Sequence, residues 1–442
     1  MAGLGPSPMD HDERVAQFRQ RYEKLTEAYR NLKLFPLLSA EEIEKFRVPY
    51  GQRALVKLRS DILASDEAGK LIFTGHRGCG KSTLLAQLAR RLRDDGHFVA
   101  LFSIADMVEM SDVNHINILY AIALKLLSQA TKLQVPIPES TKTTLMTWFT
   151  ETKSRTYSDQ LKQEMGLGGK FFELFTAKLQ KEAAFREEIK QTYERRVSDL
   201  SRQIDLIAAA IQTATKKPVL VIIDDLDKLD LAVVRTIFQD NIKALFSPNI
   251  RVVFTIPIAV MREPRLITTL DSDSRIVMLP VTKFFPQEVA HQEDASPIEE
   301  NVQRLVALLE KRVSDELIEP EMKRQIVLLS GGVLRELVRL AQECIRECMI
   351  ELEAEITPDV KIDASMLELS VRSLRNQFAR TLGSNLYGLL VETYREFTPA
   401  DIKSDEFLEL LHGLYVLEYE NDDLWYDLHP IVVDLLKRRK LI

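Results

Sequence analysis

The fold is decided by the stretch Gly75-His-Arg-Gly-Cys-Gly80-Lys81-Ser82, which follows the apolar run Leu71–Thr74. The stretch matches the spacing G-x-x-x-x-G-K-[ST] at every fixed position. Successive backbone N–H groups can curl around a phosphate only where glycine permits the required dihedral angles. The Lys81 ammonium supplies charge to the outer phosphates, and the Ser82 hydroxyl is a ligand for Mg²⁺. The stretch therefore predicts a phosphate-binding loop between a strand and a helix.

This loop is expected to contact ATP through eight residues. The helix that begins there also directs its positive end at the anion. A thiol at a helix N-terminus has a lowered pKa, which raises the alternative of a redox role for Cys79. Because Cys79 occupies a variable position of the spacing, we interpret it as a small residue. The expected nucleotide-binding residues are Gly75, Arg77, Gly78, Cys79, Gly80, Lys81, Ser82 and Thr83.

A second motif, Pro218-Val-Leu-Val-Ile-Ile-Asp224-Asp225-Leu226-Asp227, places carboxylates where a buried strand ends. Ligand sites in open α/β sheets lie at the carboxyl ends of the strands. We expect Asp224 to bind Mg²⁺ together with Ser82. Asp225 is expected to polarise the attacking water, with Asp227 as the alternative. A solvated acidic turn is the competing interpretation of the motif.

Short β-branched runs predict a parallel sheet buried on both faces. A fourth strand, Val252–Ile256, carries Thr255, which either senses the γ-phosphate or acts only as a capping residue. The fold class is therefore α/β, a P-loop NTPase with a five-stranded parallel sheet. The five expected strands are Leu71–Thr74, Phe98–Phe102, Val219–Ile223, Val252–Ile256 and Ile276–Leu279.

Helical patterns surround these strands. An apolar seam from Val15 to Leu32 predicts a helix that packs on the ATPase domain, and Ser39–Glu42 forms a capping box. One long amphipathic helix is expected over Phe185–Ile211. A hairpin after the last helices predicts a winged-helix domain. The expected domains are an N-terminal helical arm (1–45), a P-loop ATPase core (46–290) with a helical insertion at about 140–217, a helical lid (291–384) and a winged-helix-like domain (385–442).

The order of these motifs resembles that of AAA+ ATPases and their STAND and KAP relatives. GHRGCGKST is followed by IIDDLDKL, a strand ending in FTIP, SGGVLRELVRL and the hairpin; a similar order occurs in origin-recognition and transposition-regulator ATPases. The resemblance covers about residues 45–442 and implies that Arg335 is the second sensor, although Arg339 shares its helix face. Asp225 stands where many such ATPases carry glutamate, and its shorter side chain predicts slow hydrolysis. Candidates for an arginine finger are Arg262, Arg265 and Arg275.

Composition narrows the setting. The 442 residues carry a formal net charge of −7, which disfavours a generic nucleic-acid binder. The three cysteines have no paired spacing, and a metal site at Cys344 and Cys348 would need further ligands. There is no apolar run of membrane-spanning length and no visible secretory signal. We therefore expect a cytoplasmic protein without membrane contact.

The leading functional hypothesis is a slowly hydrolysing regulatory ATPase that acts as a homo-oligomeric switch. Its output would lie in a separate effector protein, as in bacterial anti-invader systems. The first alternative is a DNA-loading or DNA-remodelling ATPase that reads duplex with the winged helix. The hairpin disfavours it, because Glu418, Glu420, Asp422 and Asp423 would repel phosphates. The second alternative is a nucleotide-locked scaffold without catalysis.

Overall fold

The computed structural model describes residues 11–138, 143, 148, 168–264, 267, 268, 270, 274–355, 359–420 and 423–442. The chain forms two compact units. The sheet unit comprises Gly51–Arg77 and Lys81–Leu279. The helical unit comprises Met1–Tyr50, Gly78–Gly80 and Pro280–Ile442. Each unit is described by itself.

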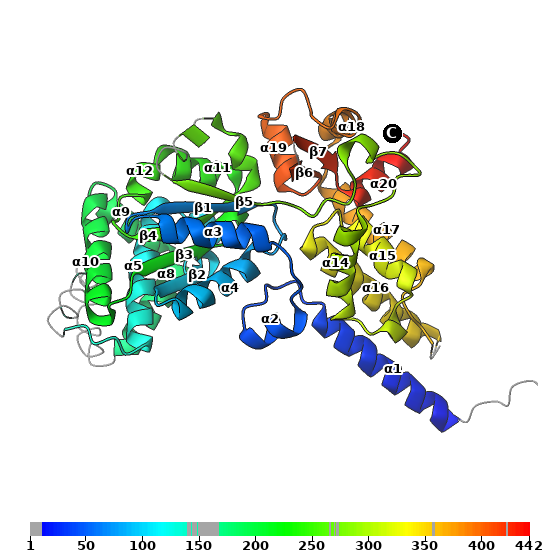
Figure 1. The fold of residues 1–442 in the computed structure, drawn as a ribbon, viewed down its shortest axis with the longest axis horizontal. Helices are drawn as coiled ribbons and strands as arrows, with labels where there is room; N and C mark the ends of the chain where they lie inside the picture. The colour runs from blue at the N-terminus through cyan, green and yellow to red at the C-terminus, as the bar shows by residue number, and fades with distance from the viewer. Residues whose placement is uncertain are drawn as a thin grey trace, which may run out of the picture. The chain divides into compact units, whose positions relative to one another are not determined.

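The sheet unit is built on a five-stranded parallel sheet with the order β2-β3-β4-β1-β5 (Figure 1). Strand β4 lies between the strand that leads into the phosphate loop and the strand that ends at Asp224. The predicted five-stranded parallel sheet is thus confirmed. The strands are β1 (Lys70–Gly75), β2 (Phe98–Ser103), β3 (Val219–Asp224), β4 (Arg251–Pro257) and β5 (Arg275–Leu279).

Helices cover both faces of this sheet, because consecutive strand residues point to opposite faces and apolar residues occupy both sets of positions. The positions of Ile72, Val221 and Phe254 join one large core with the helices that follow β2. The opposite face packs against α3 (Gln52–Ala64) and α4 (Lys81–Asp94), the first of which lies in front of the strands in Figure 1. The helices of the large core are α5 (His115–Lys132), α8 (Gly168–Lys181), α9 (Ala183–Tyr193) and α10 (Val197–Thr215).

The single long helix expected over Phe185–Ile211 is wrong in one respect. Its apolar face is buried as predicted, but the helix breaks between α9 and α10. Both helices pack against α5, and the break lets the chain change direction while keeping its apolar face on the same core. Arg196, the first residue before α10, has a non-helical backbone and pairs with Asp199 at 2.7 Å. No glycine or proline marks this break in the sequence.

The helical unit contains the N-terminal helices and most of the second half of the chain. Ser39 caps α2 in the predicted capping box: its hydroxyl accepts a hydrogen bond from the Glu42 N–H, and the Glu42 carboxylate accepts one from the Ser39 N–H. Up to residue 381, the main described helices of this unit are α1 (His11–Asn31), α2 (Ala40–Phe46), α14 (Glu299–Glu310), α15 (Pro320–Leu329), α16 (Leu334–Glu355) and α17 (Ala364–Thr381). Cys344 and Cys348 are buried on α16, and no metal-ligating group forms around them in the described chain.

Helix α1 packs on α16 of the helical unit, whereas the sequence had predicted packing on the ATPase domain. Its C-terminal half buries Leu25 and Leu32 against α16. The Arg21 guanidinium also donates to the Val360 carbonyl at 2.8 Å, and Lys24 pairs with Glu316 at 2.7 Å. Val15, at the start of the seam, is exposed, whereas Leu25 and Leu32 near its end are fully buried, so the C-terminal half of the predicted seam is core.

The C-terminal hairpin has the predicted strands, β6 (Val416–Glu420) and β7 (Leu424–Leu428), paired antiparallel. It lies among α18 (Tyr387–Glu396), α19 (Asp405–His412) and α20 (Pro430–Arg438). Glu418 is buried, so it is not among the acidic groups that the hairpin presents to phosphates; residues 416–419 are all buried, which shows that both faces of β6 are covered. Glu420 and Asp423 are exposed, and Asp422 lies outside the described residues.

Short helices connect the main elements. Within the part of the chain that the structure describes, no helix combines the length and the hydrophobicity needed to cross a bilayer. The short segments are η1 (Ile104–Asp106), η2 (Met110–Asp112), η3 (Leu226–Lys228), α11 (Leu231–Arg235), the π-helical η4 (Thr236–Asp240), α12 (Ile242–Leu245), η5 (Ile258–Arg262), η6 (Gln287–Val289), η7 (Asp315–Leu317) and η8 (Ser384–Leu386).

The packing of α1 gives a testable prediction. Leu25→Ala should lower the free energy of unfolding of the helical unit by about 2–5 kcal/mol, because it leaves a cavity against α16. Val15→Ala on the exposed part of the same helix should change it by less than about 0.5 kcal/mol. Urea unfolding in a Trp148→Phe background measures this, since the remaining Trp425 is buried in the helical unit. Equal effects of the two substitutions would contradict the packing.

Candidate nucleotide-binding site

The phosphate loop joins the end of β1 to the start of α4 and requires glycine at its turns. Gly75 has φ +150°, and a Cβ there would lie 2.5 Å from the Leu279 carbonyl oxygen. Gly80 has φ +88°, a left-handed backbone conformation that residues other than glycine rarely adopt. His76 is buried, and burial, followed by the Lys81 charge, lowers its pKa to about 3. The loop therefore holds a neutral imidazole next to its lysine.

The Lys81 ammonium lies inside the loop. Its Nζ donates to the carbonyl oxygens of Gly75 and His76, both at 2.8 Å. The third partner is the Asp227 carboxylate, also at 2.8 Å, and both side chains of this pair are buried. Three acceptors thus replace water around the buried ammonium and hold it inside the loop.

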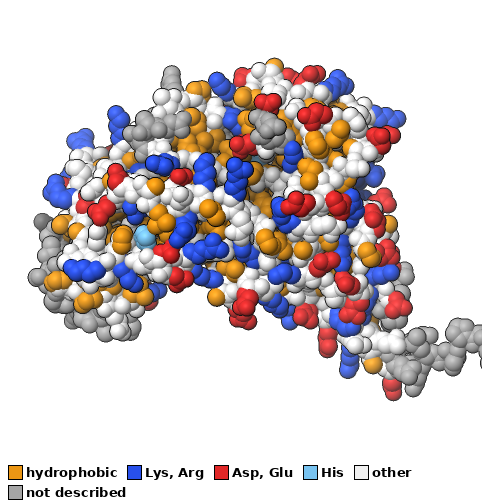
Figure 2. Space-filling view, in the orientation of Figure 1, with side chains coloured by type: hydrophobic (Ala, Val, Ile, Leu, Met, Phe, Trp, Pro, Cys, Tyr) orange, Lys and Arg blue, Asp and Glu red, His pale blue; other side chains and the backbone are white. Residues whose placement is uncertain are grey.

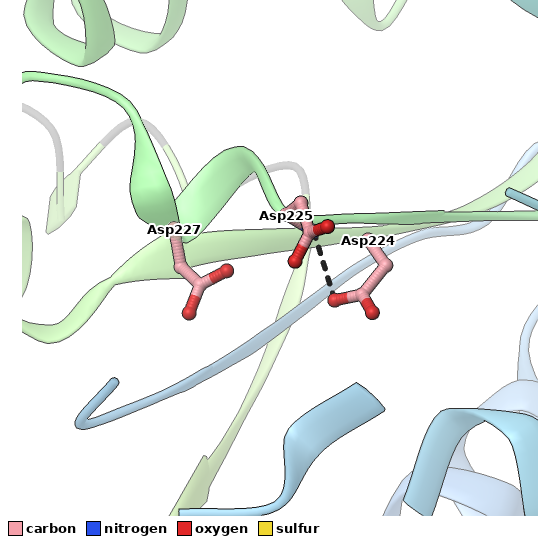
Figure 3. A group of neighbouring side chains, drawn as sticks. All are labelled: Asp224, Asp225 and Asp227. Atoms are coloured by element: carbon pink, nitrogen blue, oxygen red, sulfur yellow. Dashed lines mark hydrogen bonds between the residues drawn. The ribbon is translucent and has the colours of Figure 1, made fainter. Parts of the chain in front are cut away.

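Three carboxylates gather where β3 ends. Asp224, Asp225 and Asp227 each place an oxygen within 4.8 Å of the others (Figure 3). Burial, followed by the charges of Asp225 and Asp227, raises the pKa of Asp224 to about 6. The same carboxylate accepts hydrogen bonds from the Ser82 hydroxyl and from the Asp225 backbone N–H, the latter at 2.8 Å.

This donor set fits a hard divalent cation. Ser82 and Asp224 offer a hydroxyl and a carboxylate oxygen side by side, the ligand types that Mg²⁺ prefers. Because burial and the neighbouring carboxylates disfavour the charged form of Asp224, a cation beside it would stabilise that form. The sequence had placed the metal ligands at these two residues.

Asp225 has a different environment, which the sequence did not reveal. Its backbone is left-handed, with φ +68°. Its Oδ2 accepts a hydrogen bond from the Ser103 hydroxyl at 2.6 Å, and its Oδ1 lies 2.5 Å from the Lys228 ammonium. Ser103 ends β2, which pairs directly with β3, so the rule that sites form at strand ends could have found it. Both carboxylate oxygens are therefore held by neighbours.

The Thr255 hydroxyl interacts with the backbone that follows β3. It accepts a hydrogen bond from the Leu226 N–H at 3.1 Å and donates to the Ile223 carbonyl at 3.3 Å. The residue is fully buried. These contacts fix the turn that carries the three carboxylates, which corresponds to the capping alternative for Thr255.

The remaining loop residues differ in their surroundings. Arg77 donates to the Lys228 carbonyl at 3.3 Å, which connects the loop to the turn after β3. Cys79 is fully buried and hydrogen-bonds with the side chain of Tyr50 in the helical unit. Ser82 and Thr83 lie in the first turn of α4 and are half-buried.

Arg335 and its alternative Arg339 are distinguished by their contacts. In the helical unit, the Arg335 backbone N–H donates to the Gly78 carbonyl at 3.0 Å. Among the described residues its guanidinium has no hydrogen-bond or ion-pair partner, whereas Arg339 pairs with Glu336 at 3.1 Å and contacts Gln377. Of the finger candidates, Arg275 lies 3.5 Å from Asp61, Arg262 ends η5, and Arg265 lies outside the described residues.

A comparison of the sequence with known protein families agrees with the strand order of the sheet. Residues 50–240 match the family model of the AAA ATPase domain, which agrees with the P-loop NTPase fold and the AAA+-like strand order of the sheet unit. No curated protein matches the chain.

Several solved structures are similar to the chain at low identity. A Walker-type ATPase of Pyrococcus abyssi is 14% identical with a TM-score of 0.42, and the match covers 92% of this chain and 99% of that chain. Cdc6p of Pyrobaculum aerophilum is 11% identical with a TM-score of 0.40, covering 92% and 97%. The Aeropyrum pernix Orc1 protein in complex with DNA is 12% identical with a TM-score of 0.40, covering 91% and 96%.

The two roles considered for Thr255 predict different variants. If its hydroxyl fixes the turn, Thr255→Val should lower the free energy of unfolding by about 1–3 kcal/mol without nucleotide, because the buried Leu226 N–H loses its acceptor. Thr255→Ser keeps the hydroxyl and should recover most of this loss. Chemical denaturation of the nucleotide-free protein measures both. Unchanged stability of Thr255→Val, with only hydrolysis impaired, would favour the sensor role instead.

Proposed function

We propose that this chain binds ATP with Mg²⁺ and hydrolyses it slowly, as an oligomerising switch of the AAA+/STAND type. The observation that carries the proposal is the buried Lys81 ammonium inside the glycine loop, next to the Ser82–Asp224 pair. A phosphate entering the loop would meet a charged donor already in position. In this proposal the loop residues from Gly75 to Thr83 contact the nucleotide, and Ser82 and Asp224 hold the metal, which supplies positive charge to the phosphates.

Asp225 is the proposed base. In the reaction a water oxygen bonds to the γ-phosphorus, the bond to the β–γ bridging oxygen breaks, and Asp225 accepts the water proton. The contacts of Asp225 with Ser103 and Lys228 support slow turnover, because both carboxylate oxygens must be released or shared before they can take a proton. Asp227 is the less favoured base, since its carboxylate already neutralises Lys81.

A switch needs a part that responds differently to two nucleotide states. The proposed responder is Arg335, whose backbone contacts Gly78 and whose guanidinium forms no hydrogen bond or ion pair with the described residues. A charged phosphate would attract this guanidinium, whereas Arg339 is retained by Glu336. In this proposal, attraction of Arg335 to the phosphate shifts the helical unit. A homo-oligomer, the winged helix and a separate effector protein then convert that shift into a signal. The same proposal covers a KAP-like ATPase, because it makes no distinction between the STAND and KAP subtypes.

The alternative of a DNA-loading or DNA-remodelling ATPase is less favoured. A wing that approaches duplex needs basic groups, whereas the exposed hairpin residues Glu420 and Asp423 are acidic. Some exposed basic residues near the hairpin also have partners in the chain: Arg438 pairs with Asp434 at 3.3 Å, and the Arg439 guanidinium lies 4.7 Å from the Tyr387 ring centre. These contacts reduce the charge available for phosphates.

Removal of Lys81 should abolish nucleotide binding. We expect Lys81→Ala to weaken ATP binding at least about a hundredfold, because the anion loses its charged donor. Titration with a fluorescent ATP analogue measures the loss. Lys323→Ala is the matched control, since Lys323 is also a buried, ion-paired lysine, with Glu310 at 3.4 Å, but lies on α15.

The variant must lose affinity without losing its fold. Lys81→Ala leaves the buried Asp227 carboxylate unpaired, so the double variant Lys81→Ala/Asp227→Asn should restore thermal stability without restoring affinity. Equal nucleotide affinity in wild type and both Lys81 variants would refute the proposed binding site.

Asp225→Asn should retain ATP binding and lower kcat at least about a hundredfold, since the amide cannot take the proton. Single-turnover hydrolysis measures the change, and wild-type kcat should itself lie below about 10 per second. Asp230→Asn, on an exposed aspartate of the same turn, is the control. Unchanged hydrolysis in Asp225→Asn would assign the base elsewhere.

A variant of Ser103 distinguishes slow hydrolysis through Asp225 from the scaffold alternative, in which no residue acts as a base. Ser103→Ala should raise kcat while leaving nucleotide affinity unchanged, because one oxygen of Asp225 is released from its hydrogen bond. If Ser103→Ala and Asp225→Asn both leave hydrolysis at the background level of the Lys81 variant, the scaffold alternative is correct.

A further inference from the structure

The segment between α1 and α2 presents hydrophobic side chains to solvent. Phe35 is 80% exposed and Leu38 is 55% exposed, and Leu34 beside them is also exposed. Single exposed hydrophobic residues are ordinary, but three within five positions of one connection form a patch. The acidic residues Glu41 and Glu44 follow on α2 and are exposed as well. We call these five residues the arm patch.

The arm patch is held in place from both sides. Leu32 before it is buried, and its carbonyl accepts a hydrogen bond from the Gln342 amide of α16 at 2.9 Å. The capping box of Ser39 and Glu42 fixes the start of α2, and Phe46 at the end of that helix is buried. Because the flanks are anchored, the exposed side chains are presented at low entropic cost to a partner.

A second surface with complementary character lies on α3. Val56 is 59% exposed, and Leu63, two turns later on the same helix, is exposed too. Arg53 and Lys57 flank Val56 and are exposed. We call these four residues the α3 patch. Figure 2 shows basic side chains, with hydrophobic ones between them, over the region of α3 and α4.

The charges of the two patches are opposite and unused. Neither Glu41 nor Glu44 forms an ion pair with any residue that the structure describes. The same holds for Arg53 and Lys57 in the described chain, whereas the neighbouring Arg59 pairs with Asp95 at 2.8 Å. Each patch thus combines exposed aliphatic or aromatic groups with charges that the other lacks, a pattern of complementary interfaces.

We propose that the arm patch of one copy docks on the α3 patch of a second copy of this chain. Phe35 would bury its ring against Val56 and Leu63, while the glutamates face Arg53 and Lys57. Because the two patches differ, each copy both gives and receives this contact, which two copies satisfy reciprocally across a two-fold axis and larger numbers of copies satisfy in a ring or a filament. The role of this contact as the assembly surface of the switch rests on the proposed function, but the contact itself does not require nucleotide binding.

Removal of the hydrophobic groups tests the contact. Sedimentation velocity of the full chain over a concentration series, with and without a slowly hydrolysed ATP analogue, should show association of the wild type. Phe35→Ser and Val56→Ser should each weaken that association about tenfold or more. The control is Leu133→Ser, since Leu133 is 61% exposed but lies at the end of α5, outside both patches. A wild type that stays monomeric in both series, or a Phe35→Ser variant that associates like wild type, would overturn the proposal.

Charge reversal tests the pairing of the two patches. Glu41→Lys/Glu44→Lys makes the arm patch basic, and Arg53→Glu/Lys57→Glu makes the α3 patch acidic. Each double variant alone should associate poorly, whereas an equimolar mixture of the two, and the quadruple variant, should associate again. If the mixture associates no better than its components, the arm patch does not bind the α3 patch.

Failure of this proposal is distinguishable from failure of the proposed function. The patch variants should bind a fluorescent ATP analogue as wild type does, because no patch residue belongs to the nucleotide site. Normal nucleotide binding with unaltered association in the patch variants would refute only the docking contact. Absence of nucleotide binding in the wild type would refute the proposed function, while the association series without nucleotide would still decide the contact.

Discussion

The buried ion pair between Lys81 and Asp227 is the interaction on which the rest of the site depends. Burying an isolated ammonium in the loop would cost several kcal/mol of desolvation free energy, as an order of magnitude. A counter-charge and hydrogen bonds offset that cost. Asp227 supplies the charge, and the carbonyls of Gly75 and His76 supply the remaining acceptors. The pair also joins two motifs that are far apart in the sequence, since Lys81 begins α4 and Asp227 follows β3. The loop therefore has its shape before any anion arrives.

Three aspartates within four residues acquire different properties from their neighbours. Asp224 is buried next to Ser82 and has a raised pKa. Asp225 is held by a hydroxyl and an ammonium, while Asp227 is consumed by the loop lysine. Thr255 fixes the backbone from which the last two project. Position along the turn, and not residue type, thus separates a metal ligand, a candidate base and a structural counter-ion.

Much of this arrangement could be predicted from the sequence, because glycine spacing and apolar runs are local signals. The five strands and the residues of the loop follow from such patterns. Other features depend on neighbours that are remote in sequence. The contact of Ser103 with Asp225 requires knowing that β2 pairs with β3, and the break between α9 and α10 follows from packing against α5. The burial of Glu418 also depends on remote neighbours, because residues 416–419 are all buried and no local pattern shows that both faces of β6 are covered.

The helical insertion has a further consequence for the chemistry. It connects β2 to β3, so the chain leaves Ser103 through the helices of the large core and returns through α10 to Asp225. A hydrogen bond of 2.6 Å weakens when its atoms separate by a few tenths of an ångström. Aromatic and aliphatic side chains of the insertion share one core with β2 and β3, so a change in their packing would reach the Ser103–Asp225 contact through the strands. Repacking that interior would thus alter the surroundings of Asp225 without changing any residue of the phosphate loop.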